Sequence, residues 1–84
     1  MLEFKFDTQC LIEGVNLPNE DVINNYIKTN IKGDSLLAVG DDTLIKIHYH
    51  TNEPWKVIEY AASLGELHDV VIENMERQAN GKKG

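Results

Sequence analysis

The sequence predicts an α+β fold of the ferredoxin-like type, a sandwich in which four antiparallel strands form one sheet and two helices cover one face. Residues 2–12 and 44–50 alternate between apolar and polar side chains, as half-buried strands do. Residues 20–32 and 54–64 repeat apolar side chains at helical spacing, and short apolar runs supply two further strands. The order is therefore β-α-β-β-α-β, and right-handed crossovers place the first and third strands side by side in the sheet centre.

The first strand is predicted within residues 2–12. Its core set comprises Phe4, Phe6, Cys10 and Ile12, while its polar set comprises Glu3, Lys5, Asp7 and Gln9. Since side chains alternate across a strand, the two sets lie on opposite faces of the sheet.

The first helix is expected to begin at Asn19, whose side chain can cap it, with Glu20 and Asp21 favourable beside the positive end of the helix dipole. Gly33 is expected to end this helix. Its apolar side comprises Val22, Ile23, Tyr26, Ile27 and Ile31.

Residues 35–39 and 44–50 flank the turn segment Gly40-Asp41-Asp42-Thr43, which predicts a hairpin. Its second strand has a predicted core set of Ile45, Ile47 and Tyr49. Turn chemistry alone explains the two adjacent aspartates.

The second helix is expected to be capped by Thr51 or Asn52, to carry Pro54 in its first turn and to end at Gly65. Trp55 either covers the end of the core, which we expect, or forms an exposed contact. The apolar side of this helix comprises Val57, Ile58, Ala61, Ala62 and Leu64.

The last strand is predicted over residues 68–73. The residues from Arg77 onward are polar and end in a glycine- and lysine-rich segment. We therefore expect one domain over residues 1–76 and a flexible C-terminal tail over residues 77–84.

Bulk composition narrows the function classes. The chain of 84 residues carries a formal net charge of -6 and no basic stripe, so nucleic acid is not an expected partner. No apolar run approaches the length of a membrane span or the form of a signal peptide. The single cysteine cannot form an intramolecular disulfide, which agrees with a cytoplasmic location.

Two histidines two residues apart, His48 and His50, raise the question of a metal site. Strand parity turns both away from the core, onto the sheet face without helices. Asp7 emerges on the same face of the neighbouring first strand. A carboxylate and two imidazoles are ordinary ligands of zinc and other divalent metals, so these three residues form the candidate site. The alternative is that they are solvated surface residues.

Other candidates are weaker. Cys10 faces the core, where a free cysteine behaves as a small apolar residue. His68 begins the last strand and is expected to be an edge or half-buried residue, not a fourth ligand. The chain has no glycine-rich nucleotide loop and no nucleophile elbow, so intrinsic catalysis is unsupported.

Residues 33–54, GDSLLAVGDDTLIKIHYHTNEP, resemble the middle domain of the dihydroxyacetone-kinase-like proteins that serve as the ATP-binding subunit of bacterial fatty acid kinase. The resemblance continues through KVIEYA, GEL and IENM, and more loosely through FDTQCLIEG at residues 6–14. It implies that a kinase domain belongs to the same parent chain and that a DegV-type fatty-acid-binding protein is the partner. No nucleotide is expected to bind this fragment itself.

The resemblance also bears on the metal site. The family cysteine and the two histidines look like a metal cluster, and an alignment on Thr8 and the Glu13-Gly14 pair places Asp7 at the cysteine position. A carboxylate is a harder ligand than a thiolate and usually a weaker one for zinc.

Three functional hypotheses follow. The first, which we favour, is a non-catalytic accessory module that positions the kinase relative to its partner or forms a homodimer. The second is a stand-alone metal-dependent enzyme, for which only Lys46 and Glu13 are available as acid or base. The third is a small-molecule-binding sensor, by analogy of fold.

Overall fold

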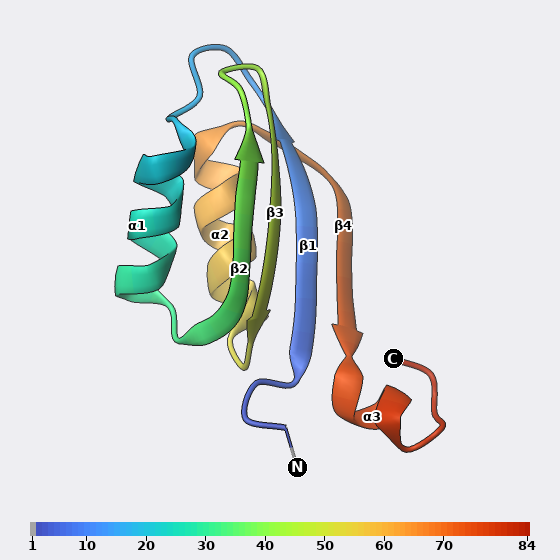
Figure 1. The fold of residues 1–84 in the computed structure, drawn as a ribbon. Helices are drawn as coiled ribbons and strands as arrows, with labels where there is room; N and C mark the ends of the chain where they lie inside the picture. The colour runs from blue at the N-terminus through green and yellow to red at the C-terminus, as the bar shows by residue number, and fades with distance from the viewer. Residues whose placement is uncertain (1) are drawn as a thin grey trace.

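The computed structural model describes residues 2–84 and has a sheet covered by two helices on one face (Figure 1). Met1, the first residue of the predicted domain, lies outside the described residues. The elements are β1 (Phe6–Glu13), α1 (Glu20–Asn30), β2 (Gly33–Gly40), β3 (Leu44–Thr51), α2 (Pro54–Leu64), β4 (Glu66–Asn74) and α3 (Met75–Ala79).

All strand pairs are antiparallel, and the strand order is β2-β3-β1-β4. The predicted ferredoxin-like fold is therefore confirmed, with β1 and β3 in the centre of the sheet. Phe6, the first residue of β1, lies opposite Asn74, the last residue of β4. The two ends of the chain consequently lie at the same end of the sheet (Figure 1).

The core lies between the sheet and the two long helices. As predicted, β3 contributes Ile45, Ile47 and Tyr49, each at most 3% exposed. The rest of the buried apolar set comprises Cys10, Ile12, Leu17, Ile23, Ile27, Ile31, Ala38, Val57 and Ala61. The prediction for the start of the first strand was wrong in part, because Phe4 precedes β1 and both Phe4 and Phe6 are only half-buried. On the helices, Val22, Tyr26 and Ala62 are exposed instead of buried.

The first helix begins as predicted, since the Asn19 side chain accepts a hydrogen bond from the Val22 amide at 3.0 Å. Its predicted end was wrong. The helix stops at Asn30, and Ile31 already has an extended backbone. Gly33 is instead the first residue of β2, where a Cβ atom would overlap with the carbonyl oxygen of His50. The sequence requires glycine here for a close strand approach.

The second helix begins at Pro54 and ends before Gly65, but its cap differs from the prediction. Glu53 is the N-cap residue and makes no side-chain cap hydrogen bond. Thr51 is instead the buried last residue of β3 and donates to the Lys32 carbonyl at 2.8 Å. Trp55, expected to cover the core, is 62% exposed.

The last strand is longer than predicted and leads directly into α3. The segment after α3 turns back, so that the Asn74 amide donates to the Gly84 carbonyl at 3.2 Å and Arg77 Nε donates to the Lys83 carbonyl at 2.9 Å. The domain boundary predicted after residue 76 therefore falls inside α3. The flexibility of residues 77–84 stays a prediction.

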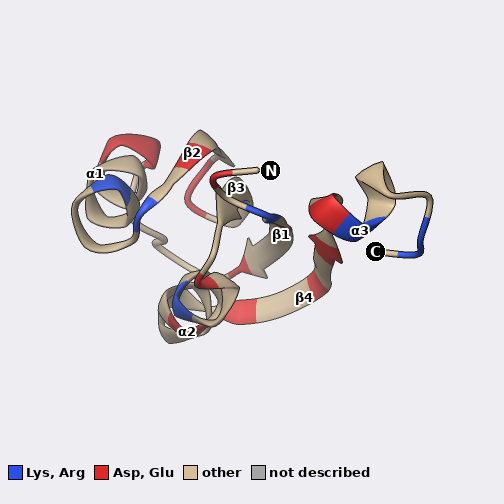
Figure 2. Cartoon of the chain, turned by 90° about the horizontal axis from the view of Figure 1, so that it is seen from below, with Lys and Arg blue, Asp and Glu red and all other residues tan. Residues whose placement is uncertain are grey.

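Charge is distributed over the whole molecule. Acidic residues occur on both layers, and lysine and arginine form no continuous stripe along the described elements (Figure 2). Among residues 2–84, no helix is long and apolar enough to cross a membrane.

Candidate metal centre

The alternation of β3 decides where the two histidines lie. Ile47 and Tyr49 point into the core, and His48 and His50 therefore share the opposite face, which α1 and α2 leave uncovered. Both imidazoles are partly shielded, with side chains 25% and 24% exposed. The predicted orientation of this pair is confirmed.

Register brings Asp7 to the same place. On β1, Asp7 lies opposite His50 and Gln9 lies opposite His48. One ligand atom from each of Asp7, His48 and His50 can be chosen so that all three lie within 4.8 Å of one another. The predicted convergence of these side chains is therefore observed, while metal binding itself stays a prediction.

The two imidazoles contact each other through their outer nitrogens. His48 Nε2 and His50 Nε2 are 3.1 Å apart, and the ring planes are tilted by 57°. Each inner nitrogen faces a carboxylate: His48 Nδ1 lies 3.5 Å from Asp7 Oδ1, and His50 Nδ1 lies 3.5 Å from Asp34 Oδ1. Gln9 Nε2 donates to Asp7 Oδ1 at 3.2 Å, which restrains that carboxylate.

These donors fit a divalent ion. Two nitrogens bound to one tetrahedral zinc ion at about 2.0–2.1 Å lie roughly 3.3–3.4 Å apart, close to the separation of the two Nε2 atoms. Imidazole nitrogen and carboxylate oxygen are both zinc ligands. Three protein ligands would leave one tetrahedral position for water or another group.

Asp34 is a residue that the sequence reasoning did not identify. Simple alternation along β2 places it on the core side, because Ala38 is buried and Asp34 has the same parity. A register shift between Asp34 and Leu37 reverses that parity. The Gly33-Asp34-Ser35 run, rich in turn-forming residues, was the available signal of an irregular strand.

The other sequence candidates lie elsewhere. Cys10 is buried in the core, and burial raises the pKa of its thiol to about 11, so it is not a thiolate ligand at neutral pH. His68 is half-buried on the edge strand β4, as expected, and its Nε2 lies 2.8 Å from Glu13 Oε1. Neither residue belongs to the Asp7, His48 and His50 cluster.

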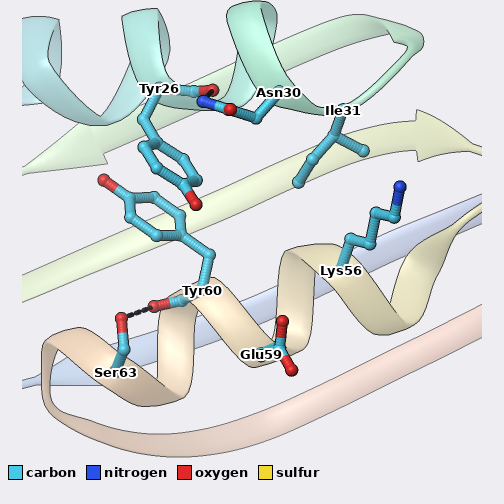
Figure 3. A pocket seen from close by; sticks show the side chains of 7 residues that line it. All are labelled: Tyr26, Asn30, Ile31, Lys56, Glu59, Tyr60 and Ser63. Carbon is cyan, nitrogen blue, oxygen red and sulfur yellow. Dashed lines mark hydrogen bonds between the residues drawn. The ribbon is translucent and has the colours of Figure 1, made fainter.

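A separate hollow lies on the helical side of the molecule. It has a volume of about 370 Å³ and is lined by residues of α1, α2 and the segment after α1. Figure 3 shows the Tyr26 and Tyr60 rings face to face across it, with ring centroids 3.8 Å apart. Ser63 Oγ donates to the Tyr60 carbonyl at 2.6 Å and so bonds within its own helix. The hollow contains no cluster of ligating groups among the described residues.

Comparison with known proteins identifies the family. The FakA-like middle-domain family of fatty acid kinase matches residues 3–82. Protein YloV of Bacillus subtilis (strain 168) is 50% identical over 79 residues, which cover 92% of this chain and 14% of that protein. Uncharacterized proteins of Staphylococcus haemolyticus (strain JCSC1435) and Staphylococcus aureus (strain USA300) are each 46% identical over 46 residues, 55% of this chain and 8% of theirs.

The chain thus spans about a seventh of the length of YloV. The resemblance drawn from the HYHTN motif and its surroundings is confirmed, because the family match extends over nearly all of the sequence. The chain belongs to the FakA-like family of fatty acid kinase proteins and corresponds to their middle domain.

Proposed function

We propose that this domain is a non-catalytic accessory module of a fatty acid kinase-like protein and that it holds a divalent metal ion at Asp7, His48 and His50. The observation that carries the proposal is the convergence of these three side chains, from two adjacent strands, on the sheet face without helices. Zinc is the metal whose ligand preferences the set matches best.

The role of such an ion would be structural. Asp7 belongs to β1, while both histidines belong to β3, so one ion would join the two central strands. Zinc bound by protein side chains contributes directly to the stability of small domains. A stabilised sheet would present a fixed surface to the kinase domain of the parent chain and to a DegV-type fatty-acid-binding protein.

The enzyme alternative has less support. Hydrolysis at a metal-bound water needs an acid or base within hydrogen-bond reach of the reacting group. Glu13 contacts His68 near the far end of β1, and Lys46 lies opposite Leu11, beyond the Gln9 and His48 pair. Neither candidate lies beside Asp7, so the arrangement favours binding over turnover.

The first test is the metal content and zinc affinity of the 84-residue chain. We expect stoichiometric zinc in the native protein and loss of binding in Asp7→Ala and His48→Ala. His68→Ala is the matched control, because it removes a half-buried histidine with carboxylate neighbours outside the cluster. Binding that survives both cluster substitutions, or a native chain that takes up no zinc, would overturn the metal site.

The accessory role needs the longer parent protein. In a full-length kinase protein that carries this domain, His48→Ala is expected to weaken association with the fatty-acid-binding partner and to leave ATP binding unchanged. His68→Ala again serves as the control. Loss of ATP binding in His48→Ala would instead place the site in the nucleotide machinery. Sedimentation of both proteins with and without zinc would show whether pairing of two copies accompanies metal binding.

A further inference from the structure

The open face carries one more charged group in contact with the cluster. Asp34 of β2 lies opposite His50 of β3, which in turn lies opposite Asp7 of β1. A single row across three strands thus reads carboxylate, imidazole, carboxylate. Asp34 approaches only His50, at Nδ1, and does not belong to the group whose ligand atoms lie within 4.8 Å of one another.

A strand irregularity is what brings Asp34 to this position. Two residues separate His48 from His50 on β3, whereas three separate Leu37 from Asp34 on β2, so β2 contains one extra residue. Ser35 adopts a φ of 56° there, a conformation that side chains other than glycine, asparagine and aspartate seldom take. A regular strand would place Ser35 opposite His50. The bulge substitutes a carboxylate for a hydroxyl beside the imidazole.

The two nitrogens of His50 then have different partners. Nε2 faces the other histidine, while Nδ1 faces the Asp34 carboxylate at 3.5 Å. A metal-binding histidine ordinarily donates its second ring N–H to a carboxylate or carbonyl, which fixes the tautomer and the ring orientation. A small rotation of the ring would shorten the Asp34 contact to hydrogen-bond distance.

We propose that Asp34 is the positioning residue of the metal centre: it accepts the Nδ1 proton of His50 and so leaves the Nε2 lone pair free for the ion. The inference rests on the proposed metal site and adds a residue to it. Asp34 has a side chain 60% exposed and would act through His50 without binding the metal.

The test compares two isosteric substitutions. Asp34→Asn removes the charge beside His50, and Glu73→Gln removes a charge from the β4 residue opposite Asp7 on the other side of the cluster. Titrations with zinc and with cobalt, whose visible absorption reports ligand geometry, are run on both variants. We expect Asp34→Asn to weaken binding about 10- to 100-fold and to alter the cobalt spectrum, while Glu73→Gln changes affinity by no more than about twofold.

A second measurement requires no metal. Nitrogen-15 NMR of the metal-free chain, at a pH above the range in which histidine titrates, identifies which ring nitrogen carries the proton. We expect His50 to be protonated at Nδ1 in the native chain and to become a mixture of tautomers in Asp34→Ala. An unchanged backbone amide spectrum elsewhere would show that β2 stays folded.

The outcomes separate the two proposals. Native zinc binding that is lost in His48→Ala but unaffected by Asp34→Asn would overturn the role of Asp34 and leave the metal site standing. An unchanged His50 tautomer in Asp34→Ala would also overturn that role. A native chain that binds neither metal would overturn both proposals.

Discussion

Asp7 gives this metal centre an oxygen ligand at the position where the family resemblance places a thiolate. Its carboxylate receives a hydrogen bond from Gln9 and faces Nδ1 of His48, so its position depends on both central strands. Oxygen ligands hold zinc less firmly than thiolates and tolerate harder metals. The residue therefore determines both the strength and the selectivity of the site.

Replacing Asp7 with cysteine tests its role as a ligand. If Asp7 binds the ion, Asp7→Cys should raise zinc affinity by roughly tenfold or more, because the thiolate is the softer ligand. Competition with a chromophoric chelator measures the change. Glu73→Cys, which adds a thiol outside the cluster on the same face, controls for adventitious binding. Weaker binding in Asp7→Cys would mean that Asp7 orients the imidazole of His48 instead of binding the metal.

Cys10 makes the stability of the fold depend on alkaline pH. Burial raises the pKa of its thiol from 9.0 to about 11. Because the neutral thiol is favoured only in the folded chain, its contribution is complete below pH 9.0 and is lost as the pH rises through about 11. Desolvation also raises the pKa of Tyr49, which acts in the same direction.

Denaturant unfolding across this range is the corresponding measurement. The free energy of unfolding should fall as the pH rises above 9.0, and the fall should be smaller in Cys10→Ala than in the native chain. The comparison uses the slope with pH, since the cavity left by the substitution lowers stability at every pH. Equal slopes in the two proteins would show that Cys10 does not titrate differently on folding.

At the scale of the elements, the junction of β2 and β3 depends on Gly33. A Cβ atom there would overlap with the His50 carbonyl and would lie 2.6 Å from Tyr49 Cζ. Gly33→Ala should therefore destabilise the fold by about 1–3 kcal/mol, as overpacking does. Thermal unfolding measures the loss. Gly81→Ala, where nothing lies within 4 Å of the added atom, should leave the melting temperature nearly unchanged.

The regular elements could be predicted because each has a clear period. Alternation in residues 44–50 fixed which side chains of β3 face the core, and the same parity placed Asp7 beside His48 and His50. Charge and register did not need to be known. The candidate site followed from parity on the two central strands alone, where β1 and β3 pair without a bulge.

The remainder depended on tertiary contacts that no local pattern records. Gly33 appeared to be a helix stop, but it serves a close approach between strands. Thr51 appeared to be a helix cap, but its hydroxyl donates to the Lys32 carbonyl in the neighbouring segment. Asp34 was missed because a single extra residue in β2 reverses the face on which it lies.

At the scale of the whole molecule, a bound ion would connect β1 and β3, which α1 and β2 separate in the sequence. Ligands that bind only the folded state stabilise it by about 2.7 kcal/mol at a concentration 100 times the dissociation constant. For a domain of this size, zinc at that concentration should raise the melting temperature by on the order of 10 °C.

The nucleotide gives the contrasting expectation. Since the chain has no glycine-rich phosphate loop, saturating ATP with magnesium should leave the melting temperature unchanged. Scanning fluorimetry with zinc, ATP and both together provides the comparison. A rise with ATP alone would contradict the assignment of nucleotide binding to another part of the parent protein.

The pairing of Phe6 with Asn74 has a mechanical consequence. Both ends of the domain leave the sheet at the same edge, from adjacent antiparallel strands (Figure 1). Tension applied through these ends would peel β4 from β1 like a zipper, one pair of hydrogen bonds after another, instead of shearing the whole ladder at once. A domain loaded in this way yields at low force, and the pair formed by β1 and β3 lies behind the point of rupture.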